Sequence, residues 1–196
     1  MSKETELPVV TRCNWAHHDE LRAYHDREWG VPVHEENRLF ELLTLEGAQA
    51  GLSWLTVLRR REHYRSAFAG FDPDAVARFG STDIEQLVRD PGLIRHKGKI
   101  ESTVSNAAAI VALHQCGESL DNLLWSFVDG QTIPHDWSTG SGLQTSTPES
   151  TAMSRELKRR GFRFVGPTTC HALMQAAGLV NDHDPMCFRF GQVAEA

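Results

Sequence analysis

Apolar residues in this chain recur at the spacing of α-helices, and no stretch alternates between apolar and polar residues for long enough to predict a β-strand. The pattern is strongest over residues 35–49, where the apolar stripe is wide enough to contact several neighbouring helices. Residues 129–150, rich in Thr, Ser and Gly, predict a long loop that merges into the next helix. Further helices are expected over residues 19–29, 54–68, 72–79, 81–90, 97–115, 119–128, 147–160 and 167–177. The sequence therefore predicts an all-α fold.

The composition is that of a globular protein of one domain. Of the 196 residues, 40% are hydrophobic and 23% are charged, and no apolar run approaches the length of a membrane span. The first ten residues carry acidic side chains and no hydrophobic signal region, so we expect a cytoplasmic protein. The four cysteines are then better interpreted as thiols or metal ligands than as disulfides. A formal net charge of −6 argues against non-specific coating of nucleic acid, although it permits a local basic face.

The segment LKRRGFRFVGPTTCHALMQA joins two expected helices through a short turn between Gly161 and Gly166. Glycine permits backbone conformations that a Cβ resists, and Pro167 suits the first position of a helix, whose free N–H groups can bind an anion. Apolar residues between the glycines are expected to anchor the turn in the core. Such a turn can hold a DNA phosphate, and it is also typical of an ordinary helical hairpin, so both interpretations stay open. The basic residues that favour the phosphate interpretation are Arg155, Lys158, Arg159, Arg160 and Arg163.

Two other basic segments are RHKGK at residues 95–99 and RRRE at residues 59–62. Taken alone, each is more typical of a solvated face than of a binding site. Together with the turn they can supply a positive footprint for nucleic acid that the net charge conceals.

Cysteine and histidine residues stand near both ends of the chain. The C-terminal pair is His183 and Cys187, four residues apart. The N-terminal set is Cys13, His17, His18 and His25. Two thiolates and two imidazoles suit tetrahedral zinc, and four protein ligands leave no position for water, so such a site is structural. The spacing is not that of a compact double CxxC, so unrelated surface and core side chains stay the alternative.

The segment LEGAQAGLSW combines a carboxylate with an aromatic residue. Glu46 lies in an apolar run near the expected end of a helix, and Trp54 lies at the start of the next. A lone carboxylate among apolar residues costs free energy unless it is paired or functional. Trp15, Tyr24 and Trp29 add aromatic surface that can line a pocket. In the alternative interpretation, Glu46 pairs with an arginine and the aromatic residues belong to the core.

Taken together, these segments resemble the DNA-3-methyladenine glycosylase I family. The resemblance covers residues 12–187 and rests on YHDREWGVP, LFELLTLEGAQAGLSWLTVLRRREHYR, LIRHKGKI, WSFV, LKRRGFRFVGPTTCHALMQAAGLVNDH and Cys187. It implies an all-α helix-hairpin-helix glycosylase that excises 3-methyladenine from alkylated double-stranded DNA in base excision repair. It also implies one structural zinc clasp that joins the N- and C-terminal segments. The zinc ligands that the resemblance implies are Cys13, His25, His183 and Cys187.

The resemblance assigns roles to the aromatic and acidic residues as well. Glu46 matches the active-site carboxylate, Trp54 the stacking aromatic residue and Tyr24 a hydroxyl that contacts the base. Trp15 and Trp29 match other aromatic residues of that pocket. The positions implied for DNA binding are Gly161, Phe164, Gly166, Thr168, Lys158 and Arg160.

We further expect an N-terminal extension over residues 1–11, a glycosylase domain of two helical lobes over residues 12–190, and a monomer with no protein or membrane partner. No lysine stands where bifunctional relatives place their nucleophile, so we expect no lyase step. Asp182 lies where many helix-hairpin-helix glycosylases place a catalytic aspartate. Beside His183 it can instead support a zinc ligand or cap a helix, and we expect Glu46 to matter more.

Two other classes of function share part of this pattern. A DNA-binding module without chemistry would keep the turn and the zinc, but it would have no need for Glu46, Trp54 and Tyr24. A catalytic zinc hydrolase requires an open coordination position, which two cysteines and two histidines do not leave.

Overall fold

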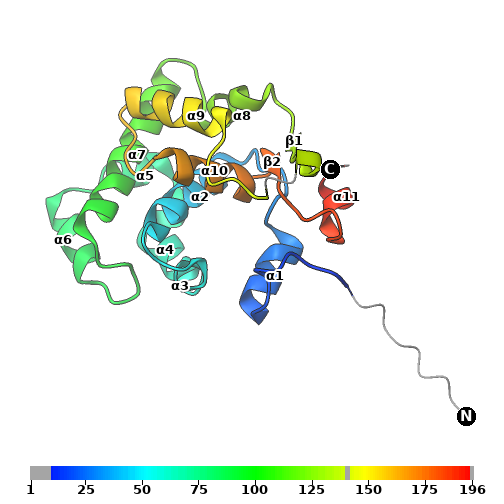
Figure 1. The fold of residues 1–196 in the computed structure, drawn as a ribbon. Helices are drawn as coiled ribbons and strands as arrows, with labels where there is room; N and C mark the ends of the chain where they lie inside the picture. Colours follow the sequence, from blue (N-terminus) through cyan, green and yellow to red (C-terminus); the bar gives the residue numbers. More distant parts are fainter. Residues whose placement is uncertain (1–9, 140–141, 195–196) are drawn as a thin grey trace, which may run out of the picture.

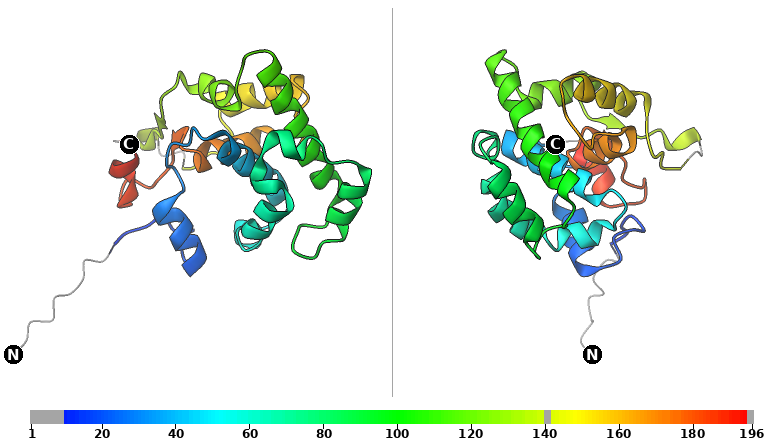
Figure 2. Two further views of the ribbon diagram at one scale, coloured as in Figure 1. Left: turned by 180° about the vertical axis from the view of Figure 1, so that it is seen from behind. Right: turned by 90° about the vertical axis from the view of Figure 1, so that its left-hand side faces the viewer.

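The computed structural model describes residues 10–139 and 142–194 of the chain, and in these residues the protein is mostly helical, as the sequence predicts (Figures 1 and 2). The α-helices are α1 (Asp19–Arg27), α2 (Glu36–Gln49), α3 (Trp54–Leu58), α4 (Arg61–Ala67), α5 (Pro73–Val76), α6 (Ser81–Arg89), α7 (Lys97–Gln115), α8 (Leu120–Trp125), α9 (Pro148–Arg159), α10 (Pro167–Ala176) and α11 (Arg189–Ala194). Three 3-10 turns are η1 (Ala69–Phe71), η2 (Ser126–Val128) and η3 (Trp137–Thr139).

Helix α2 lies at the centre of the molecule (Figure 1). Ten of its 14 residues are buried, because α3, α7, α8 and α10 all pack against it. The wide apolar stripe predicted from the sequence is therefore covered on several sides. Two carboxylates, Glu41 and Glu46, are buried on the same helix, and their surroundings differ.

Glu41 is surrounded by arginines. Its carboxylate accepts hydrogen bonds from Arg61 Nε at 2.6 Å, from Arg38 Nη1 at 2.6 Å and from Arg65 Nε at 2.9 Å. Arg61 is itself buried. The basic segment at residues 59–62 is therefore partly structural, and its prediction as a nucleic-acid footprint is wrong for Arg61, because burying Glu41 requires a compensating cation.

Helices α9 and α10 pack against each other and are joined by the Gly161–Gly166 turn. Phe162 and Val165 are buried, so the expected apolar anchoring is confirmed. Asn106 of α7 also fixes the turn, because it accepts from the backbone N–H of Arg163 at 2.8 Å and donates to the Arg163 carbonyl at 3.1 Å.

The two glycines of this turn are not equivalent. Gly161 has φ +89°, a conformation that favours glycine. Gly166 has φ −65° and ψ 161°, and a Cβ added to it would meet no atom within 4 Å. Backbone conformation therefore favours glycine at position 161 but not at position 166.

One short parallel strand pair departs from the all-α expectation. β1 (Ile133–Pro134) pairs with β2 (Val180–Asn181), and the backbone N–H of His135 donates to the carbonyl of Asn181. β1 lies inside the segment predicted as a loop. A pairing of two residues is too short to produce a pattern of alternation in the sequence, but it fixes this segment beside the chain that follows α10.

The N- and C-terminal segments meet near α1 and α11 (Figure 1), where the backbone N–H of Phe188 donates to the Thr11 carbonyl at 3.1 Å. No helix among the described residues has the length and apolar character needed to cross a membrane. Residues 1–9 of the expected N-terminal extension lie outside the described residues, and the proposed boundaries at residues 11 and 190 stay a prediction.

Candidate active site and metal centre

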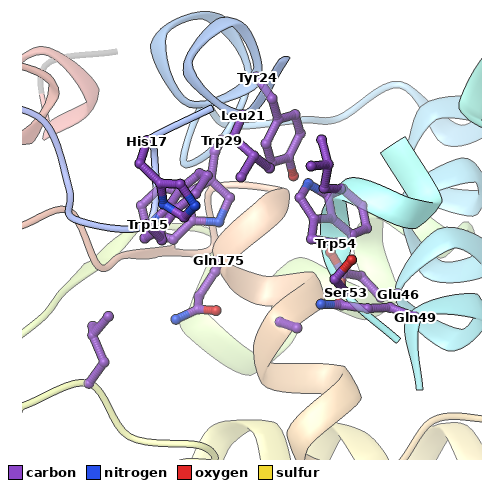
Figure 3. A pocket seen from close by; sticks show the side chains of 13 residues that line it. Trp15, His17, Leu21, Tyr24, Trp29, Glu46, Gln49, Ser53, Trp54 and Gln175 are labelled. Atoms are coloured by element: carbon purple, nitrogen blue, oxygen red, sulfur yellow. The ribbon is translucent and has the colours of Figure 1, made fainter. Parts of the chain in front are cut away.

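A cavity of about 450 Å³ opens between α1, the α2–α3 connection and α10 (Figure 3). All five residues expected to form the base pocket line it, namely Trp15, Tyr24, Trp29, Glu46 and Trp54. The structure adds lining residues that the sequence analysis did not single out for the pocket, among them His17, Gln49, Leu143 and Gln175. They come from four separate segments, so no local motif could have revealed them.

Aromatic rings stand on two sides of the cavity (Figure 3). Tyr24 and Trp54 form one pair, with ring centroids 5.2 Å apart and planes inclined by 49°. Trp15 and Trp29 form the other, with centroids 5.1 Å apart in an edge-to-face arrangement. The Tyr24 hydroxyl and Trp54 Nε1 are buried without a hydrogen-bond partner among the described residues. These unsatisfied groups suit a ligand that supplies polar atoms.

Glu46 is 6% exposed. Among the described residues it has no hydrogen bond and no ion pair, in contrast to Glu41, so the alternative in which Glu46 pairs with an arginine is not what the structure shows. Burial raises the pKa of Glu46 to about 8. Any cation that enters the pocket stabilises the ionised form of this carboxyl group.

Asp182 is buried directly after β2, beside three nitrogen atoms. Gln175 Nε2 donates to its Oδ2 at 2.6 Å, and His171 Nε2 and His135 Nδ1 each lie 3.2 Å from its carboxylate. Burial alone would raise the pKa of Asp182, but the nearby His171 imidazole, the hydrogen bond from Gln175 and the His135 imidazole together outweigh it and lower the pKa. Asp182 does not line the cavity, whereas Gln175 does.

The four expected metal ligands form one buried cluster. Their ligand atoms all lie within 4.8 Å of one another, so the group can hold a metal ion. His183 Nδ1 lies 3.6 Å from the sulfur of Cys13 and 3.6 Å from that of Cys187, and His25 Nε2 lies 3.4 Å from Cys187 Sγ. The additional His17 lies in the pocket wall instead.

The second nitrogen of each clustered imidazole is also satisfied. His25 Nδ1 lies 2.8 Å from Asp26, whose carboxylate is held by Arg12 at 2.8 Å, and His183 Nε2 donates to the Trp29 carbonyl at 3.1 Å. Such partners fix the tautomer and the ring orientation of a metal ligand. Because Trp29 also lines the cavity, the cluster and the pocket share a wall.

Burial tunes the protonation of this cluster. It lowers the pKa of His183 to about 4, which keeps the imidazole in the neutral form that binds metals. It raises the pKa of the Cys13 thiol to about 12, so a thiolate at this position requires a nearby cation. Gly30 makes room for the cluster: it has φ +80°, and a Cβ there would lie 2.9 Å from His183 Nε2.

Comparisons with known proteins identify the family of this chain. A family model described as Methyladenine glycosylase matches residues 15–190. This chain belongs to the methyladenine glycosylase family. It is 51% identical over 179 residues to DNA-3-methyladenine glycosylase 1 of Escherichia coli strain K12, a match that covers 91% of this chain and 96% of the relative. It is 47% identical over 176 residues to DNA-3-methyladenine glycosylase of Haemophilus influenzae, covering 89% and 95%.

Solved structures of methyladenine glycosylases have the same fold. A crystal structure of 3-methyladenine DNA glycosylase I superposes with a TM-score of 0.86 at 49% identity, covering 91% of this chain and 98% of that one. The Staphylococcus aureus enzyme, in a structure that describes 3-methyladenine recognition, superposes with a TM-score of 0.83 at 35% identity, covering 88% and 92%.

The residues of this chain that are expected to contact DNA occupy different environments. Lys158 and Thr168 are exposed. Arg160 is engaged by Glu156 at 2.6 Å and also by Glu118. Phe164 is half-buried at φ +57°, where it packs against Gly47 of α2.

The RHKGK segment is only partly available to nucleic acid. Lys99 is 9% exposed, and its Nζ donates to the carbonyls of Ala48 at 2.8 Å and Ala50 at 2.7 Å. It thereby satisfies carbonyls at the C-terminal end of α2, the helix that carries Glu46. The prediction that this segment contributes to a basic footprint is wrong for Lys99. Arg95 and Lys97 are exposed and can still contribute to it.

Proposed function

We propose that this chain is a monofunctional DNA glycosylase of base excision repair that hydrolyses the N-glycosidic bond of 3-methyladenine in alkylated double-stranded DNA. The observation that carries the proposal is Glu46, a buried carboxyl group without an arginine partner, in a pocket walled by four aromatic side chains. The names of the curated relatives and the Staphylococcus aureus structure support 3-methyladenine as the base.

The pocket suits a flipped cationic purine. Rotating a nucleotide out of the duplex costs a few kcal/mol. Stacking on Trp54 returns about 1–3 kcal/mol, and a cationic base gains further attraction over an aromatic face. Methylation at N3 makes adenine positively charged, whereas normal adenine is neutral, so a pocket with a lone carboxylate and aromatic faces discriminates between them.

Glu46 is the group that we expect to act on the reaction. The cationic base lowers the pKa that burial has raised, so the ionised carboxylate forms as the base binds. In this form it stabilises the positive charge that develops on the sugar as the bond to the base breaks, and it orients water toward C1′. The base is already a good leaving group, so it needs little help from an acid.

We propose no lyase step. The pocket-lining residues of the described chain include no lysine that could form a Schiff base with the sugar. Water is therefore the nucleophile, and the products are the free base and an abasic site in an intact strand.

We infer that the turn between α9 and α10 is a helix-hairpin-helix that holds a DNA phosphate. The first backbone N–H groups of α10 have no partner within the helix and Thr168 is exposed, so they can bind an anion, and Pro167 at the first position has no N–H to leave unsatisfied. A hollow of about 290 Å³ runs from Thr168 and Thr169 to Glu46 and Leu52. Leu52 is 40% exposed. A strand held by the turn would thus pass the mouth of the pocket.

We infer that the Cys13–His25–His183–Cys187 cluster holds one structural zinc ion. Metal–sulfur bonds of about 2.3 Å and metal–nitrogen bonds of about 2.0–2.1 Å place sulfur and nitrogen about 3.5 Å apart in a tetrahedron. The sulfur–nitrogen distances of 3.4–3.6 Å fit this edge. Bound there, zinc would supply cross-linking rather than chemistry, since four protein ligands leave no open position.

The direct test is release of free base from methylated duplex DNA, wild type against Glu46→Ala, with metal analysis of both proteins. We expect 3-methyladenine from the wild type only, with one zinc per chain in both. Folded, zinc-loaded wild type that releases no base would favour a DNA-binding module. Strand nicking without added base or heat would contradict the monofunctional mechanism.

A further inference from the structure

Gln175 is a polar side chain of the pocket whose orientation is fixed from behind. It lies on α10, lines the cavity and donates its amide Nε2–H to buried Asp182 at 2.6 Å. Asp182 is 3% exposed, and the other polar groups beside it are nitrogen atoms of His171 and His135, each at 3.2 Å. Only the Gln175 amide makes a hydrogen bond to this carboxylate, whereas the two imidazole nitrogens lie at ion-pair distance and His171 Nε2 has no hydrogen-bond partner among the described residues.

This arrangement permits only one orientation of the Gln175 amide. If the amide were turned over, its carbonyl oxygen would face a carboxylate oxygen, and two buried acceptors would oppose each other without a proton between them. The amide nitrogen therefore stays on Asp182. Oε1 is left to the pocket, where it accepts no hydrogen bond from the described residues. Figure 3 shows the side chain in the cavity with its oxygen on the Trp54 side.

Gln49 provides the contrast within the same pocket. It also lines the cavity, but its amide has no partner among the described residues. Gln49 can therefore present either its oxygen or its nitrogen to a bound base, whereas Gln175 can present only an acceptor.

We propose that Gln175 determines base specificity by accepting a hydrogen bond from the exocyclic amino group of 3-methyladenine, and that Asp182 is a positioning residue that acts through it. Adenine carries an amino donor at position 6, and guanine carries a carbonyl acceptor there. A guanine O6 that faced Gln175 Oε1 would bury two unpaired acceptors, so 3-methylguanine is disfavoured. This inference rests on the proposed glycosylase function.

The same geometry gives Asp182 a role different from those expected from the sequence. It is not aimed at a reacting atom, because it does not line the cavity and its carboxylate accepts the hydrogen bond from Gln175, with the imidazoles of His171 and His135 at 3.2 Å. Nor do its hydrogen bonds go to the imidazoles of the metal cluster. Asp182 instead links the β1 loop, through His135, to the pocket side of α10.

The test compares release of 3-methyladenine and 3-methylguanine from one methylated duplex, expressed as the ratio of kcat/KM values. The ratio of inhibition constants for the two free bases provides a second readout that needs no turnover. Discrimination is the ratio of kcat/KM for 3-methyladenine over 3-methylguanine, and the ratio of inhibition constants for 3-methylguanine over 3-methyladenine. We expect Asp182→Asn to lower both ratios about tenfold, because an asparagine can donate as well as accept and lets Gln175 turn over. Gln175→Met, which keeps the length but removes the acceptor, should lower them by a similar factor.

Further variants separate orientation from mere structural support. Adding Asp182→Asn to Gln175→Met should cause no further loss of discrimination, because the side chain that Asp182 orients is gone. His135→Ala, which cuts the link to the β1 loop but leaves the Gln175–Asp182 hydrogen bond, should keep the wild-type ratios. The effect of Gln49→Met should combine additively with that of Asp182→Asn. Melting temperature and bound metal are measured for each protein.

The outcomes are distinguishable from failure of the proposed function. A folded wild type that releases neither base would remove the function itself. A wild type that releases 3-methyladenine while Gln175→Met keeps both ratios would overturn the inference alone. So would a loss of discrimination on adding Asp182→Asn to Gln175→Met. If Asp182→Asn does not fold, Gln175→Met decides the question.

Discussion

Two carboxylates on α2 show how neighbouring residues of the same type acquire different roles. Glu41 and Glu46 are both buried, but three arginines compensate Glu41 and none compensates Glu46. The sequence marks Glu46 as unusual because it lies in an apolar run. It does not show that Glu41 takes the arginines, because Arg61 and Arg65 reach it from a different helix.

The lone carboxyl group of Glu46 should make the wild type less stable than Glu46→Gln at alkaline pH. Its pKa is about 8 in the folded protein and about 4.3 in an unfolded chain. The folded state therefore holds the proton between these values, and stability falls as pH rises through this window. From pH 5 to pH 8.5, the free energy of unfolding of Glu46→Gln should rise by on the order of a few kcal/mol relative to that of the wild type.

Urea unfolding of both proteins at the two pH values checks this. Titration of the metal cluster affects both proteins alike, so it cancels in the difference between their free energies of unfolding. An equal difference at pH 5 and pH 8.5 would show that Glu46 does not titrate in this range.

At the scale of elements, the sequence predicted helices well where the apolar period was long. The expected helix over residues 97–115 coincides with α7. The short pairing of β1 with β2 was missed because two residues carry no periodic signal. The burial of the Lys99 side chain was missed for another reason. A lysine in a basic run is usually solvated, and only the arrangement of α7 against the end of α2 offers it two carbonyls.

The turn between α9 and α10 allows the role of a glycine to be tested apart from its conformation. Gly166 has an ordinary φ and open space around it, so Gly166→Ala should change the free energy of unfolding by less than about 1 kcal/mol. The added methyl group stands at the N-terminus of α10, where it would hold a phosphate away. We therefore expect weaker binding of duplex DNA, measured by fluorescence anisotropy.

Gly161→Ala is the matched control. Gly161 lies away from the start of α10, and its φ of +89° would be strained in an alanine. It should lower stability by about 1 kcal/mol or more. Unchanged DNA affinity in Gly166→Ala would argue against phosphate binding at this turn.

At the scale of the whole molecule, residues from the two ends of the chain meet in the metal cluster. The sequence supplied the residue types, and the family resemblance selected His25 over His17 and His18. Spacing could not make that choice, because residues 13 and 187 are brought together only by the complete fold. The cluster also shares Trp29 with the pocket, because the Trp29 carbonyl accepts from His183 and Trp29 lines the cavity.

The clasp should stabilise the folded chain strongly. A structural zinc contributes on the order of 10 kcal/mol in small zinc domains, so a chelator should lower the melting temperature of the wild type by many degrees. Cys187→Ser should have a low melting temperature both with and without the chelator, so the chelator should change it little. Cys116→Ser is the control, because Cys116 is exposed and outside the cluster, and it should behave like the wild type.

A wild type that melts at the same temperature with and without chelator, and that contains no metal after purification, would contradict the clasp. Equal responses of Cys187→Ser and the wild type would do the same.

We expect the unpaired carboxylate of Glu46, in its aromatic pocket, to act on a cationic base. The most direct measurement is single-turnover release of 3-methyladenine from methylated duplex DNA by wild type and by Glu46→Gln, which keeps the shape and removes the charge. We predict release by the wild type and a rate lowered at least about a hundredfold in a folded variant. Equal rates would show that Glu46 is not the group on which catalysis depends.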